Sequence, residues 1–418
     1  MKIQFLLFSF LFVVWSSAQI VNIPDAQFKA KLLAANAENR IASTEMPIFD
    51  KDKGVTIYPN FQPIDTNNDG EIQISEAQAI KYLDASYTDI KDLTGIEAFS
   101  NLEYLNCDYN QLTTLDVSHN TKLEYLDCFS NQLTTLDVSH NLKLEDLDCF
   151  NNQLTTLDVS HNPNLKDLSC FSNQLTALDI SHNSELEYLG CSKNQLTSLD
   201  VSHNPNLEVL YCFNNRLTSL DVSHNPNLNA LNCSDNQLTV LDINLNIKLE
   251  YLSCASNQLT SLDVSHNPEL IKFECSHNQL TVLDVSHDTN LEYLGCDFNQ
   301  LTALDIGHKP KLTQVYCRNN QLINLDISHS INLKILNCHN NKLTTLNAIH
   351  NTNLSELYCS ENQLTTLDVS HNPKLVQLDC SKNPITYIDV SHNRNLNQNN
   401  YKEGGSMEAS YNIGPLQP

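Results

Sequence analysis

A run of oxygen-bearing side chains between residues 65 and 76 has the spacing that a hard metal ion requires. Alternate positions carry carboxylate or amide oxygens, a glycine stands at the sixth position, and a glutamate closes the run at the twelfth. Oxygens at this spacing can surround one Ca²⁺ ion, with the last glutamate binding through both carboxylate oxygens. A polar turn without an ion is the alternative. We favour structural calcium, with these ligands: Asp65, Asn67, Asp69, Glu71 through its backbone carbonyl, Gln73 and Glu76.

The residues around this run indicate which kind of calcium loop it is. Pro59 and Pro63 precede it and disfavour a regular entering helix, whereas a helix is expected from Ser75 to Ala79. The run therefore resembles a single, dockerin-like half of an EF-hand. This resemblance implies structural calcium, held with a Kd on the order of 10⁻⁴ to 10⁻³ M.

Two rows of ionisable residues recur every 21 residues in the rest of the chain. One runs from Asp116 to Asp389 and is interrupted at Asn347; a histidine follows each position after three residues, except at Leu245. Stacked carboxylates and imidazoles could bind a divalent metal or respond to pH. The alternative is a solvated face that hydrogen-bonds between turns, and it is favoured because no position is singled out. For the same reason the sequence predicts no enzymatic activity.

All fourteen cysteines lie on one progression, from Cys107 to Cys380 in steps of 21 residues. On adjacent parallel strands, equivalent side chains lie about 4.8 Å apart and point the same way, whereas a disulfide needs converging Cβ atoms about 3.8 Å apart. No C-x-x-C pair suggests zinc. The progression therefore predicts a buried row of free thiols.

The repeat unit explains this spacing. The period that starts at Leu123 begins L-E-Y-L-D-C-F-S-N-Q-L and continues T-T-L-D-V-S-H-N. The first half, L-x-x-L-x-C-x-x-N-x-L, resembles the leucine-rich-repeat family over fourteen repeats, residues 102–395. The second half alternates in the same way and predicts another strand. We expect an α/β-type, mostly β repeat: a gently curved leucine-rich-repeat solenoid with short parallel strands on both faces and a small α-helical amino-terminal cap. The asparagine row from Asn110 to Asn383 is expected to satisfy backbone groups.

Variation among the repeats points to a recognition surface. The outward positions of the first strand differ between repeats, whereas those of the second half are nearly uniform. Drift, or an aromatic ladder that only stabilises the sheet, would also produce this variation. Aromatic and acidic side chains together suit a protein partner, or a glycan whose rings stack on them. The predicted ligand-binding residues are Tyr125, Asp127, Phe129, Asp146, Asp148, Phe150, Asp167, Phe171, Tyr211 and Phe213.

The segments outside the repeats complete the organisation. Residues 1–18 have the pattern of a signal peptide cleaved after Ala18, residues 19–79 form the expected cap with the calcium loop, and residues 80–101 resemble a degenerate first repeat. Residues 396–418 hold a partial repeat and a tail. The segment around Asp92 resembles the linkers of internalin-like secreted proteins, and this resemblance implies an extracellular or periplasmic protein that binds other proteins.

Composition limits the possible partners. The chain has 24 Lys and Arg against 49 Asp and Glu, a formal net charge of -25, which disfavours nucleic acid and anionic membranes. No segment after the leader is apolar enough to span a membrane. The sequence thus predicts a non-catalytic secreted recognition module for an extracellular protein or glycan, with a structural or adhesive matrix protein as the alternative. Ligand identity and oligomeric state stay open.

Overall fold

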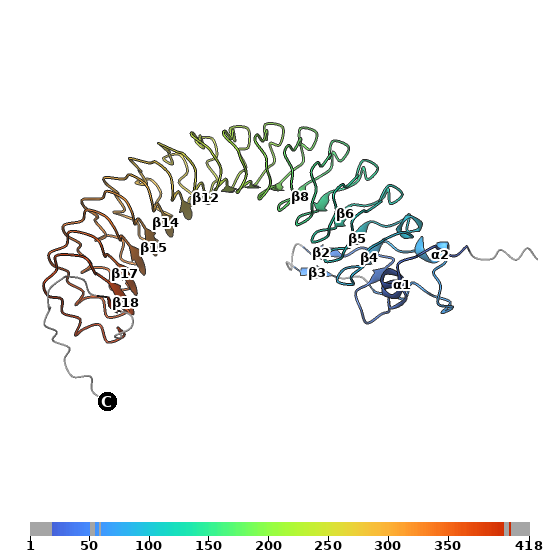
Figure 1. Ribbon diagram of the computed structural model, residues 1–418, viewed down its shortest axis with the longest axis horizontal. Helices are drawn as coiled ribbons and strands as arrows, with labels where there is room; N and C mark the ends of the chain where they lie inside the picture. The colour runs from blue at the N-terminus through green and yellow to red at the C-terminus, as the bar shows by residue number, and fades with distance from the viewer. Residues whose placement is uncertain (1–18, 51–54, 58–59, 397–400, 403–418) are drawn as a thin grey trace, which may run out of the picture.

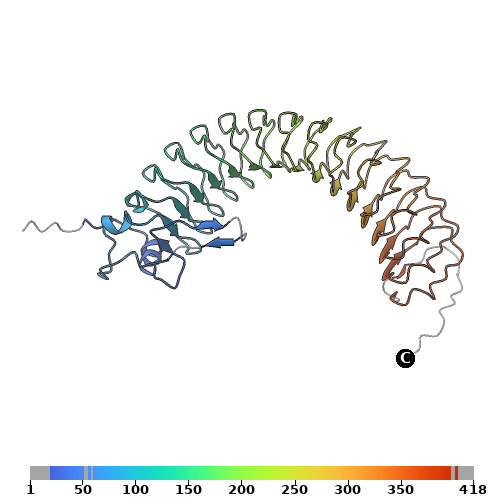
Figure 2. The same ribbon diagram turned by 180° about the vertical axis from the view of Figure 1, so that it is seen from behind.

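The computed structural model describes residues 19–50, 55–57, 60–396 and 401–402. The signal peptide predicted at residues 1–18 and the tail at 403–418 lie outside this part of the chain. The described residues form an arc of stacked turns, with the amino-terminal cap at one end and short strands along the inner edge (Figures 1 and 2). The predicted fold class, a mostly β leucine-rich-repeat solenoid, is confirmed.

One parallel sheet runs along the whole arc. Neighbouring strands pair in register with equivalent residues opposite each other, so that Leu105 faces Leu126 and Leu126 faces Leu147. Each repeat contributes one three-residue strand, in this order: β5 (Tyr104–Asn106), β6 (Tyr125–Asp127), β7 (Asp146–Asp148), β8 (Asp167–Ser169), β9 (Tyr188–Gly190), β10 (Val209–Tyr211), β11 (Ala230–Asn232), β12 (Tyr251–Ser253), β13 (Lys272–Glu274), β14 (Tyr293–Gly295), β15 (Gln314–Tyr316), β16 (Ile335–Asn337), β17 (Glu356–Tyr358) and β18 (Gln377–Asp379).

Further elements extend or cover the sheet. β4 (Tyr82–Asp84) pairs in parallel with β5, β1 (Ala42–Ser43) pairs antiparallel with β4, and β19 (Tyr401–Lys402) pairs with β18. The remaining elements of the described chain are α1 (Ala26–Leu33), α2 (Ile74–Ala77), the antiparallel pair β2 (Ile48–Asp50) and β3 (Val55–Ile57), and a 3₁₀ turn (Ile96–Ala98). Asp25 caps α1 by accepting hydrogen bonds from the backbone of Gln27 and Phe28, and its second oxygen accepts from Lys91 and Asp92.

The core is a stack of identical layers. In each turn the middle strand residue, the cysteine and the flanking leucines are buried, as for Leu123, Leu126, Cys128 and Leu133, all 0% exposed. All fourteen cysteines are buried and free, as predicted. Burial raises the pKa of the Cys170 thiol to about 12, so the row behaves as small apolar side chains.

Buried asparagines tie the turns together. The side-chain amide of Asn131 donates to the carbonyls of Cys107 and Cys128 at 3.0 and 3.1 Å, and its oxygen accepts from the backbone of Leu112. This bears out the role predicted for the row from Asn110 to Asn383. A backbone N–H or C=O buried in these turns would otherwise cost about 1 to 3 kcal/mol.

The second strand predicted for each repeat is wrong for most of the solenoid. On that side the described residues form only isolated bridges, between Asp116, Asp137 and Asp158 and between Asp305 and Asp326. In most repeats the aspartate accepts a hydrogen bond from the backbone of the serine two residues later, for example 3.0 Å from Ser118 to Asp116, and this bond closes a local turn on that side. With a continuous sheet on one side alone, the solenoid forms a pronounced arc instead of the gentle curve expected (Figure 1).

Candidate recognition surface and calcium loop

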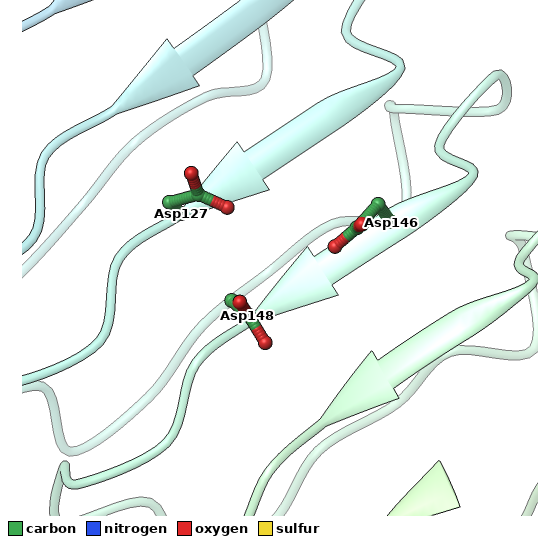
Figure 3. A group of neighbouring side chains, drawn as sticks. All are labelled: Asp127, Asp146 and Asp148. Carbon is green, nitrogen blue, oxygen red and sulfur yellow. The ribbon is translucent and has the colours of Figure 1, made fainter. Parts of the chain in front are cut away.

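Three aspartates on adjacent strands bring their carboxylates together on the sheet surface. Asp127 closes β6, and Asp146 and Asp148 begin and end β7 (Figure 3). One oxygen from each lies within 4.8 Å of the others, and each side chain is half-buried. The Tyr104 hydroxyl donates to Asp127 Oδ2 at 2.5 Å. The sequence had placed all three on the same surface; the structure makes them one cluster.

Burial and mutual repulsion weaken the acidity of this cluster. The pKa of Asp146 is raised to about 8, first by burial and then by the charges of Asp167, Asp148 and Asp127. Burial likewise raises the pKa of Asp127 to about 7, although the hydrogen bond from Tyr104 opposes the shift. Burial also raises the pKa of Asp148, and that of Asp167 to about 6. Holding these groups ionised together is therefore unfavourable, and a bound cation would favour their ionised forms.

Aromatic rings stack in a column beside the cluster. The ring centroids of Phe129 and Phe150 lie 4.2 Å apart, those of Phe150 and Phe171 lie 4.3 Å apart, and both pairs are nearly parallel. Sequence analysis missed that Tyr109 and Tyr87 extend the column, with Tyr109 edge-on to Phe129 and stacked on Tyr87 at 4.4 Å. The phenylalanines are half-buried, whereas Tyr87 and Tyr109 are 69% and 46% exposed.

These two tyrosines were missed because they stand off the strand alternation. They occupy the position two residues after the cysteine or its equivalent, where every repeat turns out of its strand with φ between +47° and +56°. An L-residue other than asparagine or aspartate is costly in this left-handed region. The presence of large aromatic residues at such a position was the sequence signal that could have identified Tyr87 and Tyr109 as part of the column.

Two of the predicted residues lie apart from the column. Tyr211 contacts Tyr188 edge-on at 6.0 Å, and the Lys193 ammonium lies 5.9 Å from the Phe213 ring. Ser192 occupies the position between Phe171 and Phe213, and it interrupts the stack. The predicted surface is therefore divided into an acidic and aromatic part over β6 to β8 and a separate pair at β10.

The predicted calcium loop is wrapped around its first aspartate. Asp65 accepts hydrogen bonds from the backbone of Asp69 and Gly70 at 3.2 and 2.9 Å, and Gly70 has φ +79°. The Asn67 amide donates to Asp69 and Gln73. Backbone and side-chain donors lower the pKa of Asp69, first among them the Glu71 N–H, and so keep this carboxylate ionised.

The closing glutamate is held by hydrogen bonds within the loop. Glu76 Oε1 accepts from the backbone and hydroxyl of Thr66 at 2.8 and 2.7 Å, and Oε2 accepts from the backbone of Gln73. Within the described chain the three loop carboxylates do not approach to 4.8 Å of one another. The oxygen donors fit calcium in type and order. Glu71 uses its side chain for an ion pair with Lys29 on α1, 2.6 Å long, and this pair links the loop to the cap.

The histidine row forms a regular solvated edge. In most repeats histidine Nδ1 lies within hydrogen-bond distance of the preceding serine hydroxyl, as for His119 and Ser118 at 3.1 Å. Across residues 19–50, 55–57, 60–396 and 401–402, no histidine belongs to a group of three ligand atoms within 4.8 Å. The solvated-face interpretation therefore fits this row better than a metal site.

Comparison with known proteins identifies the family to which the repeat belongs. Residues 184–224 match the family description "Leucine Rich repeats (2 copies)". The functional domain of InlJ from Listeria monocytogenes, which includes a cysteine ladder, is 41% identical with a TM-score of 0.76, and the match covers 80% of this chain and 74% of that one. The chain belongs to the leucine-rich-repeat family.

Two other solved structures share the fold of this leucine-rich-repeat protein. A leucine-rich-repeat protein of Leptospira interrogans is 26% identical with a TM-score of 0.66, over 77% of this chain and 94% of that one. The ectodomain of the Arabidopsis thaliana receptor kinase GASSHO1/SCHENGEN3, solved with CASPARIAN STRIP INTEGRITY FACTOR 2, is 21% identical with a TM-score of 0.69, over 80% and 45%. A search of curated protein sequences gives no match. None of the helices in the described chain has the length and hydropathy to cross a membrane.

Proposed function

We propose that this leucine-rich-repeat protein is a non-catalytic recognition module that binds an extracellular protein through the inner face of its arc. One observation carries the proposal: the stacked phenylalanines and the aspartate cluster occupy that face over β6 to β8, whereas the opposite edge repeats the same Asp, Ser and His. The plant receptor ectodomain with the same fold is solved with a bound factor, which supports ligand recognition as the general role of the solenoid. The leader-like pattern at residues 1–18 supports export.

Replacing Phe129, Phe150 and Phe171 together by serine is expected to abolish partner binding. The substitutions remove the aromatic surface and leave the buried leucines and cysteines in place. Pull-down from the natural surroundings, followed by mass spectrometry, measures the effect, and we expect at least a tenfold loss of the captured partner. A melting curve confirms folding.

The matched control replaces Val240 and Val282 by serine. These valines are 70% and 69% exposed, in the second half of their repeats, away from the strands. This variant should capture the partner as the parent does. Equal capture by the phenylalanine variant would refute the proposed face.

We also propose that the loop from Asp65 to Glu76 binds one structural Ca²⁺ ion. Asp65, Asn67, Asp69, Gln73, Glu76 and the Glu71 carbonyl would hold the ion, and its charge would bind the cap residues together. The loop is already tied to α1 through Lys29 and to the amino-terminal segment of the cap through the bridge between Ile20 and Gln73. Calcium would therefore stiffen the cap that covers the end of the solenoid core.

Calcium at 10 mM is expected to stabilise the parent by about 1.4 to 2.7 kcal/mol for a Kd between 10⁻³ and 10⁻⁴ M. Asp65→Ala and Glu76→Ala should each lose this rise in melting temperature and the calorimetric heat of binding. Glu38→Ala, which removes an exposed cap carboxylate outside the loop, should retain both. A parent whose melt is insensitive to calcium and chelator would show that the loop is an ordinary polar turn.

A further inference from the structure

We infer that the acidic part of the inner face binds a cationic protein segment, one that presents arginine or lysine side chains. This inference rests on the proposed function and names the chemistry of its partner. The carboxylates of Asp127, Asp146, Asp148 and Asp167 would face such a segment from strands β6 to β8, and the buried Asp108 stands two residues after β5.

The charges that act on Asp146 and Asp127 are all negative, whereas Asp108 also has a cation, Lys31, acting on it. The charged groups that act on Asp146 are the carboxylates of Asp167, Asp148 and Asp127, and all three oppose its ionisation. Those acting on Asp127 are Asp148, Asp108 and Asp84. A cation brought by a partner would relieve this repulsion at several groups together, because each of these aspartates lies within range of the others.

A buried acceptor without a donor lies in the same group. Asp108 is 4% exposed, and its Oδ1 has no hydrogen-bond partner. Its charge raises the pKa of Asp127. Its own pKa is raised to about 6, first by burial and then by the charges of Asp84 and Asp148, although Lys31 opposes the shift. An unsatisfied buried acceptor costs about 1 to 3 kcal/mol, and an N–H donor from a partner would recover part of this cost.

The protein itself shows how a guanidinium fits this face. Further along the arc, Arg318 Nε donates to Asp297 Oδ2 at 2.8 Å, and its guanidinium lies 5.2 Å from the centroid of the Phe298 ring. Asp297 occupies the same repeat position as Asp108, and Phe298 the same position as Tyr109. Asp108 and Tyr109 thus repeat the pair that holds Arg318, whereas the position equivalent to Arg318 is occupied by Phe129, which brings no cation. An arginine from a partner would supply the missing cation.

The aromatic column beside the cluster suits the stems of these cationic side chains. Lysine and arginine bury their methylene groups along apolar surface while the charged group reaches a carboxylate. The half-buried rings of Phe129, Phe150 and Phe171 run parallel to the row of aspartates from repeat to repeat. A segment lying along the arc would therefore meet carboxylates and ring edges together.

The test uses the full chain and a defined probe. The probe is a labelled eight-residue peptide of alternating arginine and alanine, with glutamate replacing arginine in a second peptide. Binding is measured by fluorescence anisotropy at low and moderate salt. The variant Asp127→Asn/Asp146→Asn/Asp148→Asn keeps side-chain shape and removes three carboxyl groups. The matched control, Asp116→Asn/Asp137→Asn/Asp158→Asn, removes the same number of carboxyl groups from the same region of the arc, on the opposite edge.

We expect the arginine peptide to bind the parent and the opposite-edge control equally, and to bind the inner-face variant at least tenfold more weakly; the glutamate peptide should not bind. Equal weakening in both variants would mean that only net charge attracts the peptide, and would overturn the inference. The inference would also be overturned if the arginine peptide did not bind the parent. It would be overturned likewise if Ca²⁺ from CaCl₂ bound at the three aspartates and prevented peptide binding. If the peptide fails while the phenylalanine variant still loses its partner, the inference falls and the proposed function stands.

Discussion

Replacing Asp288 and Lys309 together by asparagine is expected to raise the free energy of unfolding by about 2 to 4 kcal/mol. Both residues stand in a second asparagine row, from Asn120 to Asn393, that is buried on the side of the turns away from the strands. In an intact part of this row the Asn141 amide donates to the carbonyls of Val117 and Asn120 at 3.1 and 3.0 Å. Asp288, Lys309 and Ser330 interrupt the row in three consecutive repeats.

The interruption buries two ionisable groups. Asp288 is 0% exposed, neither of its carboxylate oxygens has a hydrogen-bond partner, and burial raises its pKa to about 7 although Lys309 opposes the shift. Burial lowers the pKa of Lys309, whose ammonium donates to the Val285 carbonyl. Asparagine at both positions restores amide donors to carbonyls one turn away and removes the cost of burying the charges.

Thermal and urea unfolding measure this gain, and the reverse substitution is its control. Asn267→Asp introduces a carboxylate into the intact row one repeat earlier and should lower stability by a similar amount. The expectation that Asp288 and Lys309 destabilise the protein would be refuted if the double asparagine variant were no more stable than the parent. It would fail equally if Asn267→Asp were neutral.

The stability of the protein is expected to fall as the pH rises from 5 to 8.5. Asp127 and Asp146 have pKa values of about 7 and 8 in the folded protein, above the ordinary value of 3.8. At pH values between 3.8 and these raised pKa values, the folded state binds more protons than the unfolded state, so unfolding becomes easier as the pH rises. Deprotonation of the two coupled groups should lower the free energy of unfolding by on the order of 5 kcal/mol across this pH window.

Melting temperature as a function of pH tests this expectation. The parent should lose about 5 to 10 °C between pH 5 and 8.5. Asp127→Asn/Asp146→Asn should show a flatter profile and exceed the parent at the alkaline end. Asp116→Asn/Asp137→Asn should keep the parent's slope, because hydrogen bonds from Ser118 and Ser139 lower the pKa of those carboxylates and so move their titration away from this window. Parallel profiles for all three proteins would contradict the shifted acidity of the inner face.

The single period of 21 residues was enough to predict the core. Cys128 and its equivalents identify the inward positions, and the side chains between them, such as Asp127 and Phe129, then have to share the outer surface of the strand. The Asn131 row could be assigned for the same reason, because a turn after a strand leaves backbone groups that a side-chain amide can satisfy. The row through Asn141 is equally regular, and its repetition was the signal that it too is buried.

Periodicity could not distinguish a strand from a series of turns in the second half of each repeat. Leu136 and Val138 alternate as in a strand, but on this side the described residues pair only through isolated bridges, and the Ser139 backbone bonds to Asp137 in a local turn. Only the stacked turns show whether one continuous sheet forms or two. The curvature of the arc develops only when many turns are stacked, so no single repeat contains it.

The repeat pattern of the chain is thus sufficient for the solenoid, the buried thiols and the identity of the outward residues, because these depend on spacing within one turn and between equivalent positions. The acidic cluster depends on more. Asp127, Asp146 and Asp148 come from two strands, and their carboxylates meet because the paired strands hold them side by side and neighbouring side chains keep them half-buried. Distances between side chains of different turns, and the burial that shifts their acidity, exist only once those turns have packed.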